Sequence, residues 1–595
     1  MKSFFKYVFA TICGILILGM VMSLMFIISL AGIAASGSSS TKVKSNSVFV
    51  ISLNGSVQER GDETSPLSML LNSADMSVMG LDQLKESIAK AKEQDDIKGI
   101  YIEGGAASFD APATAQQLRD ALVDFKKSGK WIYAYGDTYT QSAYYVASVA
   151  DSIFLNKTGM IELKGLGGKR EYMTGLYEKV GVKYQPVRVG KYKSYVESVT
   201  RKDMSPEDRE QREAYLNGIW QYWLKDIADS RKITAQALDQ AVSDSILTFA
   251  NPTDYLKDKL VDRLMYPEGI KATIKAKLGL EEKDDINQLT LEEMAGVKRK
   301  EKQKGDKVAI YYAYGEIVDQ VNNMFSTSHN IVGSEVVKDL EKLADDDDVK
   351  AVVFRVNSPG GSAAASEQIW HAVKQLKEKK PVVVSMGGYA DSGGYMISAG
   401  ANYIIAEPTT ITGSIGIFGL IPNLSGLVTD KLGITFDGTK TNRYTDFEEN
   451  LVLTKENAEE LQFMQTYVNR GYENFLSIVG DGRKMKRDEV NEIAQGRVWL
   501  ATDALKIKLV DKLGSIDDAL KKAAELAKLE EWQTCAYPEE PGFLEQLLKQ
   551  TEKKGTYLDA ELREVLGSLY DPIMDVRRNA QRSRLQARFE TKIDF

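Results

Sequence analysis

Histidine is scarce in this chain of 595 residues, which has two, His329 and His371. A serine nucleophile most often depends on a histidine base, so a serine hydrolase with this sequence would need a base of another type. Cysteine is equally scarce, because Cys13 lies in an apolar N-terminal segment and Cys535 lies near the other end. Two cysteines so placed indicate neither a disulfide framework nor a thiolate metal site. We expect no metal and no cofactor.

An excess of positive charge is also missing. The sequence has 84 acidic and 76 basic residues, a formal net charge of -8, which gives no reason to expect nucleic acid as a partner. With 43% hydrophobic and 27% charged residues, the composition is that of a globular protein. The length predicts roughly three to four structural units, so an internal repeat is worth seeking.

The C-terminal stretch VRRNAQRSRLQARFE is a local exception to the acidic balance. We expect a solvated helix there, and contact with anionic lipid or a neighbouring subunit is the alternative. Its closely spaced arginines are Arg577, Arg578, Arg582, Arg584 and Arg588.

The N-terminus carries an uncharged, mostly apolar run from Tyr7 to Ala35. This run is long enough to cross a hydrocarbon core of about 30 Å, and it is longer than the apolar region of a secretory signal. It predicts an uncleaved membrane anchor, although AGIAAS offers a small-residue cleavage site as the alternative. Lys2 and Lys6 precede the run, which favours a cytoplasmic N-terminus and places the bulk of the chain outside the cytoplasm.

The chain also matches itself at a spacing near 250 residues. DDIKGIYIEGG resembles DDVKAVVFRVNSPGG, and LRDALVDFKKSGKWIYAYGD resembles IWHAVKQLKEKKPVVVSMGG. Such self-similarity predicts two homologous halves. The predicted organisation is a cytoplasmic N-terminus (1–6), a transmembrane anchor (7–35), a linker (36–46), a first half (47–290), a second linker or exposed helix (291–306), a second half (307–535) and a C-terminal extension (536–595).

Each half alternates helical patterns with strands that are apolar almost throughout, such as GIYIEG, KWIYAYG, AVVFRVN and PVVVSMG. Continuous apolar strands are typical of parallel sheets that helices cover on both faces. The sequence therefore predicts a tandem α/β fold.

Ser392, in YADSGGYMISAG, is either a nucleophile or the polar corner of a glycine turn. The repeat places Ser142 opposite Ser392, but the first half has alanine and tyrosine where the second has Gly393 and Gly394. Small residues allow the backbone to approach a substrate and direct N–H groups at a developing oxyanion. The second half alone has this feature.

A second glycine pair, Gly360 and Gly361 in NSPGGS, follows the apolar strand AVVFRV. By itself the pair could be a routine turn. Because ligands in α/β sheets collect at the carboxyl ends of strands, two such loops indicate a shared site, and this pair could supply the second oxyanion donor.

The repeat also identifies a lysine that is present in one half and absent from the other. KYKSYVES lies opposite RYTDFEEN, which sets Lys193 against Thr445, and the register is fixed where Arg231 matches Arg483. A lysine can replace histidine as base if its pKa of about 10.4 falls by roughly 3 units, a change of about 4 kcal/mol that burial can provide. The alternative is an ordinary exposed lysine. The halves therefore look complementary, with the base in one and the serine in the other.

A neutral lysine on a flexible stem also needs orientation. Ser414, in TTITGSIGIF, follows the nucleophile region and is a candidate partner, whereas its first-half counterpart is Lys164. The alternative is a simple turn serine.

Taken together, these motifs resemble signal peptide peptidase A of bacteria, in its long, duplicated, membrane-anchored form. The resemblance covers about residues 1 to 535 and rests on the anchor, the two halves, YKSYVES followed by DMSPEDR, NSPGGS, YADSGGYMIS, TGSIGIFG and GRVW. It implies a crotonase-like or Clp-protease-like fold. It further implies Ser392 as nucleophile, Lys193 as general base, Ser414 as the residue that positions the lysine, and backbone N–H groups near Gly361 and Gly393 as the oxyanion hole.

The same resemblance implies a homotetramer in the inner membrane, shaped as a bowl open toward the bilayer, with its catalytic bulk on the periplasmic side. Asp391 departs from the family pattern, and an ionised carboxylate beside the nucleophile would raise the pKa of Lys193. The extension after about Tyr537 has no counterpart.

We therefore expect a membrane-anchored serine endopeptidase that degrades residual signal peptides through an acyl-enzyme. Its substrates would be extended hydrophobic peptides that pair with strand edges. Because fold alone does not fix function, a crotonase-like acyl-CoA enzyme and a non-catalytic membrane scaffold remain the alternatives.

Overall fold

The computed structural model describes residues 14, 19, 25, 41–61, 78–244, 247–300, 304–320, 329–538 and 586–588. Nearly all of the predicted anchor at 7–35 and most of the C-terminal extension lie outside these residues. Across the described ranges no helix is long and apolar enough to cross a membrane. The anchor therefore stays a prediction.

The first half is built on a parallel sheet in the order β2-β1-β3-β4-β5-β7, with β8 beside β1. One face is covered by α3 (Leu81–Glu93), α4 (Pro112–Lys126) and α5 (Gln141–Ala147), and the other packs against α11 (Pro267–Leu278). This two-sided cover explains why the strands are apolar throughout. The strands are β1 (Ser47–Gln58), β2 (Val78–Gly80), β3 (Ile97–Phe109), β4 (Trp131–Tyr139), β5 (Ser152–Ile161), β7 (Arg263–Leu264) and β8 (Gln288–Leu289).

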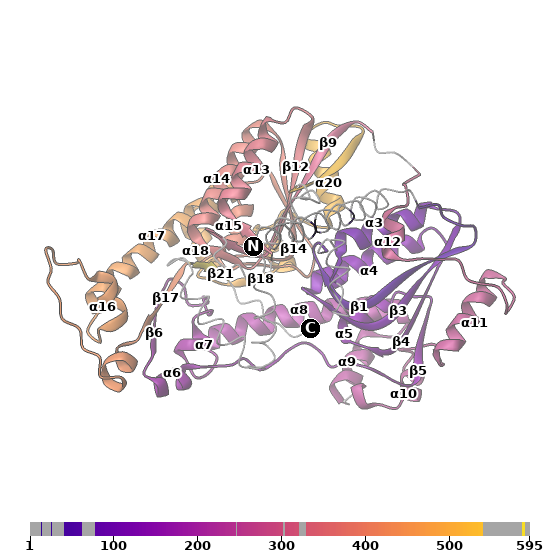
Figure 1. Cartoon of the computed structure of the whole chain (residues 1–595), viewed down its shortest axis with the longest axis horizontal. Coiled ribbons are helices and arrows are strands. Elements are labelled where there is room, and N and C mark those ends of the chain that lie inside the picture. Colours follow the sequence, from indigo (N-terminus) through magenta and orange to yellow (C-terminus); the bar gives the residue numbers. More distant parts are fainter. Residues whose placement is uncertain are drawn as a thin grey trace, which may run out of the picture.

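The second half repeats this plan in a sheet ordered β18-β16-β14-β12-β9-β20, with β15 and β19 alongside. Figure 1 shows α13 (Gly333–Asp345) and α14 (Ala363–Lys379) packed side by side over one face, and α20 (Ile516–Leu526) lies against the other. The strands are β9 (Asp306–Tyr314), β12 (Val349–Ser358), β14 (Val382–Asp391), β15 (Tyr403–Ala406), β16 (Ile411–Gly413), β18 (Val498–Leu500), β19 (Lys512–Leu513) and β20 (Trp532–Tyr537).

Two long helices make the duplication explicit. Both α8 (Pro206–Arg231) and α17 (Ala458–Arg483) have 26 residues and end at a lysine in the left-handed conformation. Their last arginines make the same bidentate ion pair, Arg231 with Asp262 and Arg483 with Asp511. The predicted duplication of an α/β unit is therefore confirmed.

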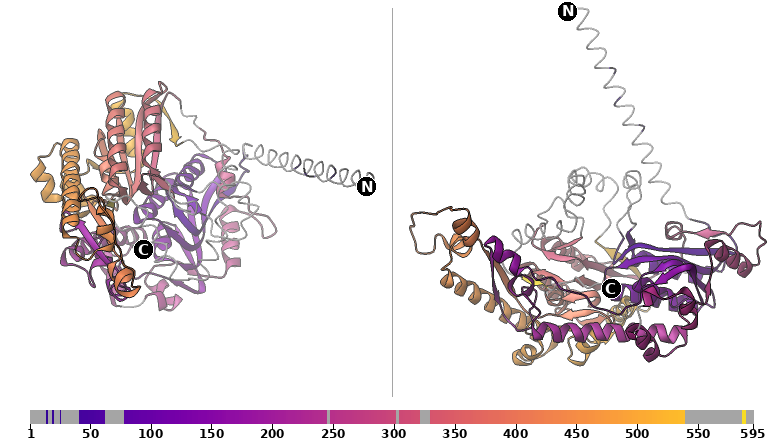
Figure 2. Two further views of the ribbon diagram at one scale, coloured as in Figure 1. Left: turned by 60° about the vertical axis from the view of Figure 1, so that its left-hand side comes forward. Right: turned by 90° about the horizontal axis from the view of Figure 1, so that it is seen from below.

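A third, smaller sheet joins the halves, in the order β11-β10-β13-β21-β17-β6. The first-half strand β6 (Lys183–Arg188) pairs antiparallel with β17 (Phe418–Asn423) of the second half. In the right-hand view of Figure 2, α8 of the first half runs along the lower edge of the molecule, and it contacts β18 of the second half. The other strands of this composite sheet are β10 (Glu316–Val318), β11 (Asn330–Val332), β13 (Gly360–Ser362) and β21 (Gln586–Arg588).

A buried polar network locks the interface between the halves. The Arg355 guanidinium, which is 1% exposed, forms a bidentate pair with Glu59, from Nε to Oε1 at 2.6 Å and from Nη2 to Oε2 at 3.1 Å. Asn357 donates to Asp110 at 3.2 Å. Buried charges are tolerated only when paired, so this network fixes how the halves dock.

Two segments differ from expectation. The predicted linker at 291–306 contains α12 (Leu291–Ala295), which packs on α3 through the buried Met294, so this end of the linker belongs to the first half. The predicted solvated helix at the C-terminus is wrong for residues 586–588, which form β21 because they pair with other strands. The remaining elements are α6 (Thr174–Val180), α7 (Glu197–Thr200), α9 (Ala235–Asp244), η1 (Leu247–Phe249), α10 (Pro252–Lys257), α15 (Gly393–Ser398), η2 (Gly426–Lys431), α16 (Phe447–Leu453), α18 (Arg487–Ile493) and α19 (Ala501–Lys506).

Candidate active site

Ser392 occupies the sharp turn between β14 and α15. Its φ of 54° and ψ of -109° lie in a region that costs a residue other than glycine about 1–3 kcal/mol. The turn is held because the Ser392 N–H donates to Gly413 O at 2.8 Å and the Ser392 carbonyl accepts from Met396 N–H at 2.9 Å. Gly394 is required by packing, since a Cβ there would lie 2.7 Å from Ser358 O. Strain of this kind is typical of functional positions.

Lys193 lies directly against this serine, although the two residues belong to different halves. Its Nζ is 2.7 Å from Ser392 Oγ, 3.0 Å from Ser414 O and 3.0 Å from Ser414 Oγ. The lysine is 1% exposed, so it is not the ordinary surface lysine of the alternative interpretation. The structure thus brings together the three side chains that the sequence singled out.

Burial determines the charge state of this lysine. Desolvation lowers the pKa of Lys193 from 10.5 to about 7, and the carboxyl of Asp391 opposes this with a smaller upward effect. Burial also raises the pKa of Asp391 well above its ordinary value, and within the described residues neither of its oxygens has a hydrogen-bond partner. The upward influence expected from Asp391 is therefore present, but desolvation of the lysine outweighs it.

Two glycines allow the lysine segment to enter the second half. A Cβ on Gly190, which has φ +97°, would lie 2.3 Å from Gln495 O, and a Cβ on Gly496, which has φ +78°, would lie 2.7 Å from Lys193 N. The Tyr192 N–H donates to Gln495 O at 3.0 Å. In the sequence, GRVW, which begins at Gly496, is only one motif of the family resemblance. It does not predict the contact of this segment with the lysine segment.

Buried side chains of α8 hold the same segment from its other side. Asp208 accepts from Ser194 Oγ at 2.6 Å and from Arg170 Nη1 at 2.7 Å. Gln211 donates to Tyr192 O at 3.1 Å. Asp208 belongs to the motif DMSPEDR at the start of α8. Through these contacts the start of α8 orders the backbone on either side of Lys193.

Ser414 is placed to orient the lysine. Its φ of 49° is a second strained position, and its N–H donates to Arg497 O at 2.7 Å. Its Oγ accepts from Lys193 Nζ at 3.0 Å and can donate to Gly496 O at 3.4 Å. With its main-chain and side-chain oxygens both on Nζ, Ser414 limits the directions in which the lysine can point.

The glycine pair of NSPGGS forms the start of β13, next to Gly393. A Cβ on Gly360, which has φ +91°, would lie 2.8 Å from Gly393 N, so Gly360 lines the space in front of that N–H. A Cβ on Gly361 would instead lie 2.0 Å from Ile317 O, against β10. The Gly393 N–H thus lies beside Gly360, whereas the donor expected near Gly361 stays a prediction.

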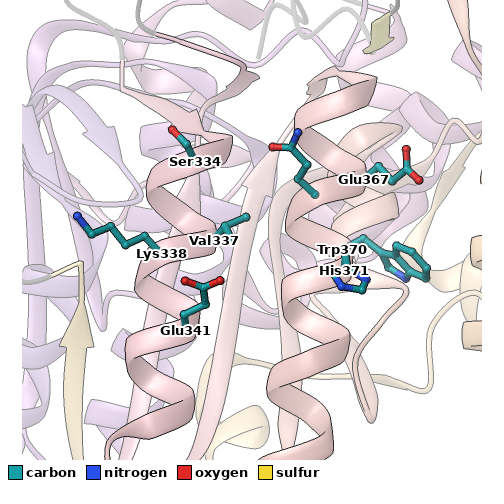
Figure 3. Close-up of a pocket in the computed structure, with 8 residues that line it drawn as sticks. Ser334, Val337, Lys338, Glu341, Glu367, Trp370 and His371 are labelled. Atoms are coloured by element: carbon teal, nitrogen blue, oxygen red, sulfur yellow. The ribbon is translucent and has the colours of Figure 1, made fainter.

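Neither histidine belongs to this site. The ring of His329 stacks on Tyr314 at 3.7 Å between centroids. His371 lines a groove of about 520 Å³ between α13 and α14 (Figure 3), whose lining contains none of the predicted site residues. Within the described residues no group of three or more histidine, cysteine, aspartate or glutamate side chains could hold a metal ion.

Comparison with known proteins agrees with the two-half architecture. The model of peptidase family S49 matches residues 124–281 and 374–530, one segment in each half, and the model of the Clp protease family matches residues 310–410. "Protease 4" of Salmonella typhi is 37% identical over 78% of this chain and 74% of its own, and "Protease 4" of Haemophilus influenzae is 34% identical over 87% and 84%. "Serine protease SPPA, chloroplastic" of Arabidopsis thaliana is 28% identical over 82% and 70%.

Proposed function

Because the chain belongs to peptidase family S49 and is a serine protease, we propose that Ser392 of the second half and Lys193 of the first half form its catalytic dyad. The observation that carries this proposal is the 2.7 Å contact between Lys193 Nζ and Ser392 Oγ. Membership of a peptidase family argues against the acyl-CoA enzyme and the scaffold considered as alternatives.

The chemistry follows from the charge state of the lysine. With a pKa of about 7, about half of the Lys193 amines are neutral at pH 7, against about 0.03% at the ordinary value of 10.5. The neutral amine accepts the hydroxyl proton as Ser392 Oγ attacks the scissile carbonyl. The resulting oxyanion lies toward the Gly393 N–H, and a fixed N–H donor stabilises it more than bulk water can.

Collapse of this intermediate breaks the peptide C–N bond. The protonated Lys193 gives its proton to the leaving amine, and the acyl group stays on Ser392 as an ester. Lys193, neutral again, then removes a proton from water, which hydrolyses the ester and regenerates the serine. Ser414 keeps the amine directed at the serine through both half-reactions.

We further propose residual signal peptides as substrates, degraded by a homotetramer anchored in the inner membrane with its catalytic bulk on the periplasmic side. The apolar run at 7–35 supports the anchor, and its flanking charges support this orientation. Extended peptides could add to the strands of the composite sheet, where main-chain hydrogen bonds accept any sequence and pockets select side chains.

Single substitutions test the dyad. Ser392→Ala and Lys193→Met should each lower kcat/KM on a fluorogenic signal-peptide substrate by about 10³-fold or more, as expected when a nucleophile or its base is removed. Ser142→Ala is the matched control, because it removes the serine at the equivalent position of the first half and should leave kcat/KM within about twofold. Wild-type activity in either dyad variant would refute the proposal.

A further inference from the structure

A segment of the chain's own C-terminal extension lies in the composite sheet, next to the dyad. Strand β21 is antiparallel to β13, with Gly360 opposite Arg588, Gly361 opposite Ala587 and Ser362 opposite Gln586. On its other side it pairs antiparallel with β17 at Phe418. Strand β21 also contacts α14 and α15 of the second half. An extended segment thus occupies the place where a substrate strand would add.

The main-chain oxygen of Ala587 lies at the candidate oxyanion site. It is 2.1 Å from the position of a Cβ on Gly360 and 3.1 Å from the position of a Cβ on Gly393. The same Gly360 position is 2.8 Å from Gly393 N. The carbonyl of Ala587 therefore lies beside the N–H that directly follows Ser392, and any side chain at position 360 would collide with it.

The side chains of β21 are accommodated as those of a bound peptide would be. Ala587 is 0% exposed and belongs to the apolar core of the second half, where there is room for a small side chain. Arg588 Nη1 is 3.0 Å from Glu316 Oε1, a charge-assisted hydrogen bond. Its guanidinium also lies 5.3 Å from the ring centre of Tyr195, two residues beyond the lysine. Both halves therefore hold the arginine.

We propose that Gln586–Arg588 is a substrate built into the chain, that Ser392 cleaves the bond between Ala587 and Arg588, and that Glu316 selects the basic residue after that bond. This inference rests on the proposed dyad. Ser392 Oγ forms an ester with the Ala587 carbonyl carbon, the bond to the Arg588 nitrogen breaks, and that nitrogen takes the proton held by Lys193. Water then hydrolyses the ester, leaving a carboxylate on Ala587 and a free amine on Arg588.

Until the bond is cut, the uncut chain competes with external peptides for its own site. Residues 588–595 leave on cleavage, and with them goes the arginine that Glu316 and Tyr195 hold. Cleavage should therefore weaken the binding of β21 in the composite sheet and raise the activity on added substrates.

Intact-mass spectrometry of the full chain tests cleavage, with a fluorogenic peptide assay on the same samples. Wild type should lose residues 588–595 on incubation, while Ser392→Ala keeps them. If wild type cleaves the fluorogenic peptide but keeps its full mass, the inference is overturned and the dyad stands. If Ser392→Ala cleaves the peptide as wild type does, the dyad itself fails. Loss of the same residues from both proteins would assign the cut to another protease and overturn the inference.

Charge reversal tests the role of Glu316. Glu316→Lys and Arg588→Glu should each slow the cut by about tenfold, the size expected of one charge-assisted hydrogen bond, and the double variant should recover to within about threefold of wild type. Lys592→Glu is the control, because it makes the same charge change four residues beyond Arg588 and should cut at the wild-type rate. A double variant no faster than the slower single variant would overturn the assignment of Glu316.

Discussion

The pH dependence of activity is the most direct measure of the buried lysine. Only neutral Lys193 can accept the serine proton, and burial lowers its pKa from 10.5 to about 7. This net shift, in which desolvation outweighs the opposing effect of Asp391, corresponds to about 5 kcal/mol at about 1.36 kcal/mol per unit. The rate should therefore rise with pH, from about 9% of maximum at pH 6 to about 91% at pH 8.

The assay is kcat/KM for a neutral fluorogenic peptide between pH 5 and 10, measured on wild type as the parent protein. Asp391→Asn keeps the shape of the side chain but removes the carboxyl that pulls the lysine pKa upward, so the midpoint should move to lower pH. Asp110→Asn is the control, because Asp110 is another buried carboxyl whose pKa is raised, to about 7, but it lies in the interface network. Its midpoint should equal that of the parent.

Two results would refute this reasoning. A midpoint above pH 9 in the parent would mean that the lysine is solvated and retains its ordinary pKa. A shift of the midpoint in Asp110→Asn but not in Asp391→Asn would assign the titration to the interface network.

Three further substitutions probe the contacts around the dyad and the ion pair between the halves. Ser414→Ala should lower kcat by about 10- to 100-fold with little change in KM, because it removes one hydrogen bond that directs the amine, and unchanged kcat in steady-state kinetics would contradict that role. Gly496→Ala should lower activity by about 100-fold or more, because its Cβ would meet the lysine backbone at 2.7 Å, whereas Gly433→Ala, with a similar φ of +68° and no atom within 4 Å, is the control for backbone strain alone. Glu59→Ala should lower the free energy of unfolding by about 3–5 kcal/mol in urea titrations, because it leaves Arg355 buried without its counter-charge, and a loss below about 1 kcal/mol would show that the pair does not hold the halves together.

The contact between Ser392 and Lys193 could be predicted from sequence because the duplication supplies an internal comparison. Ser392 stands opposite Ser142, which lacks the two glycines that follow Ser392, and Lys193 stands opposite Thr445, which has no amine. The strands were predictable for a simpler reason, since long apolar runs fit only a sheet covered on both faces.

Other features of the site could not be predicted from the sequence and are visible only in the structure. Gly190 and Gly496 look like ordinary loop glycines, and their purpose appears only when two distant segments approach within a van der Waals contact. The charge state of Asp391 depends on complete burial, which no local pattern reports. A strand as short as β21 has too few residues for any periodicity, and the arginines around it favour a helix instead.

Division of the proposed dyad between two copies of one fold has a consequence for biosynthesis. A ribosome completes the lysine-bearing copy first, and at that stage the polypeptide has a base but no alcohol to activate. The partner serine is made later. It becomes reactive only after its own copy has folded and β6 has paired with β17. The nascent protein therefore cannot digest itself or its neighbours during synthesis, and hydrolytic competence reports that both copies are finished and correctly docked.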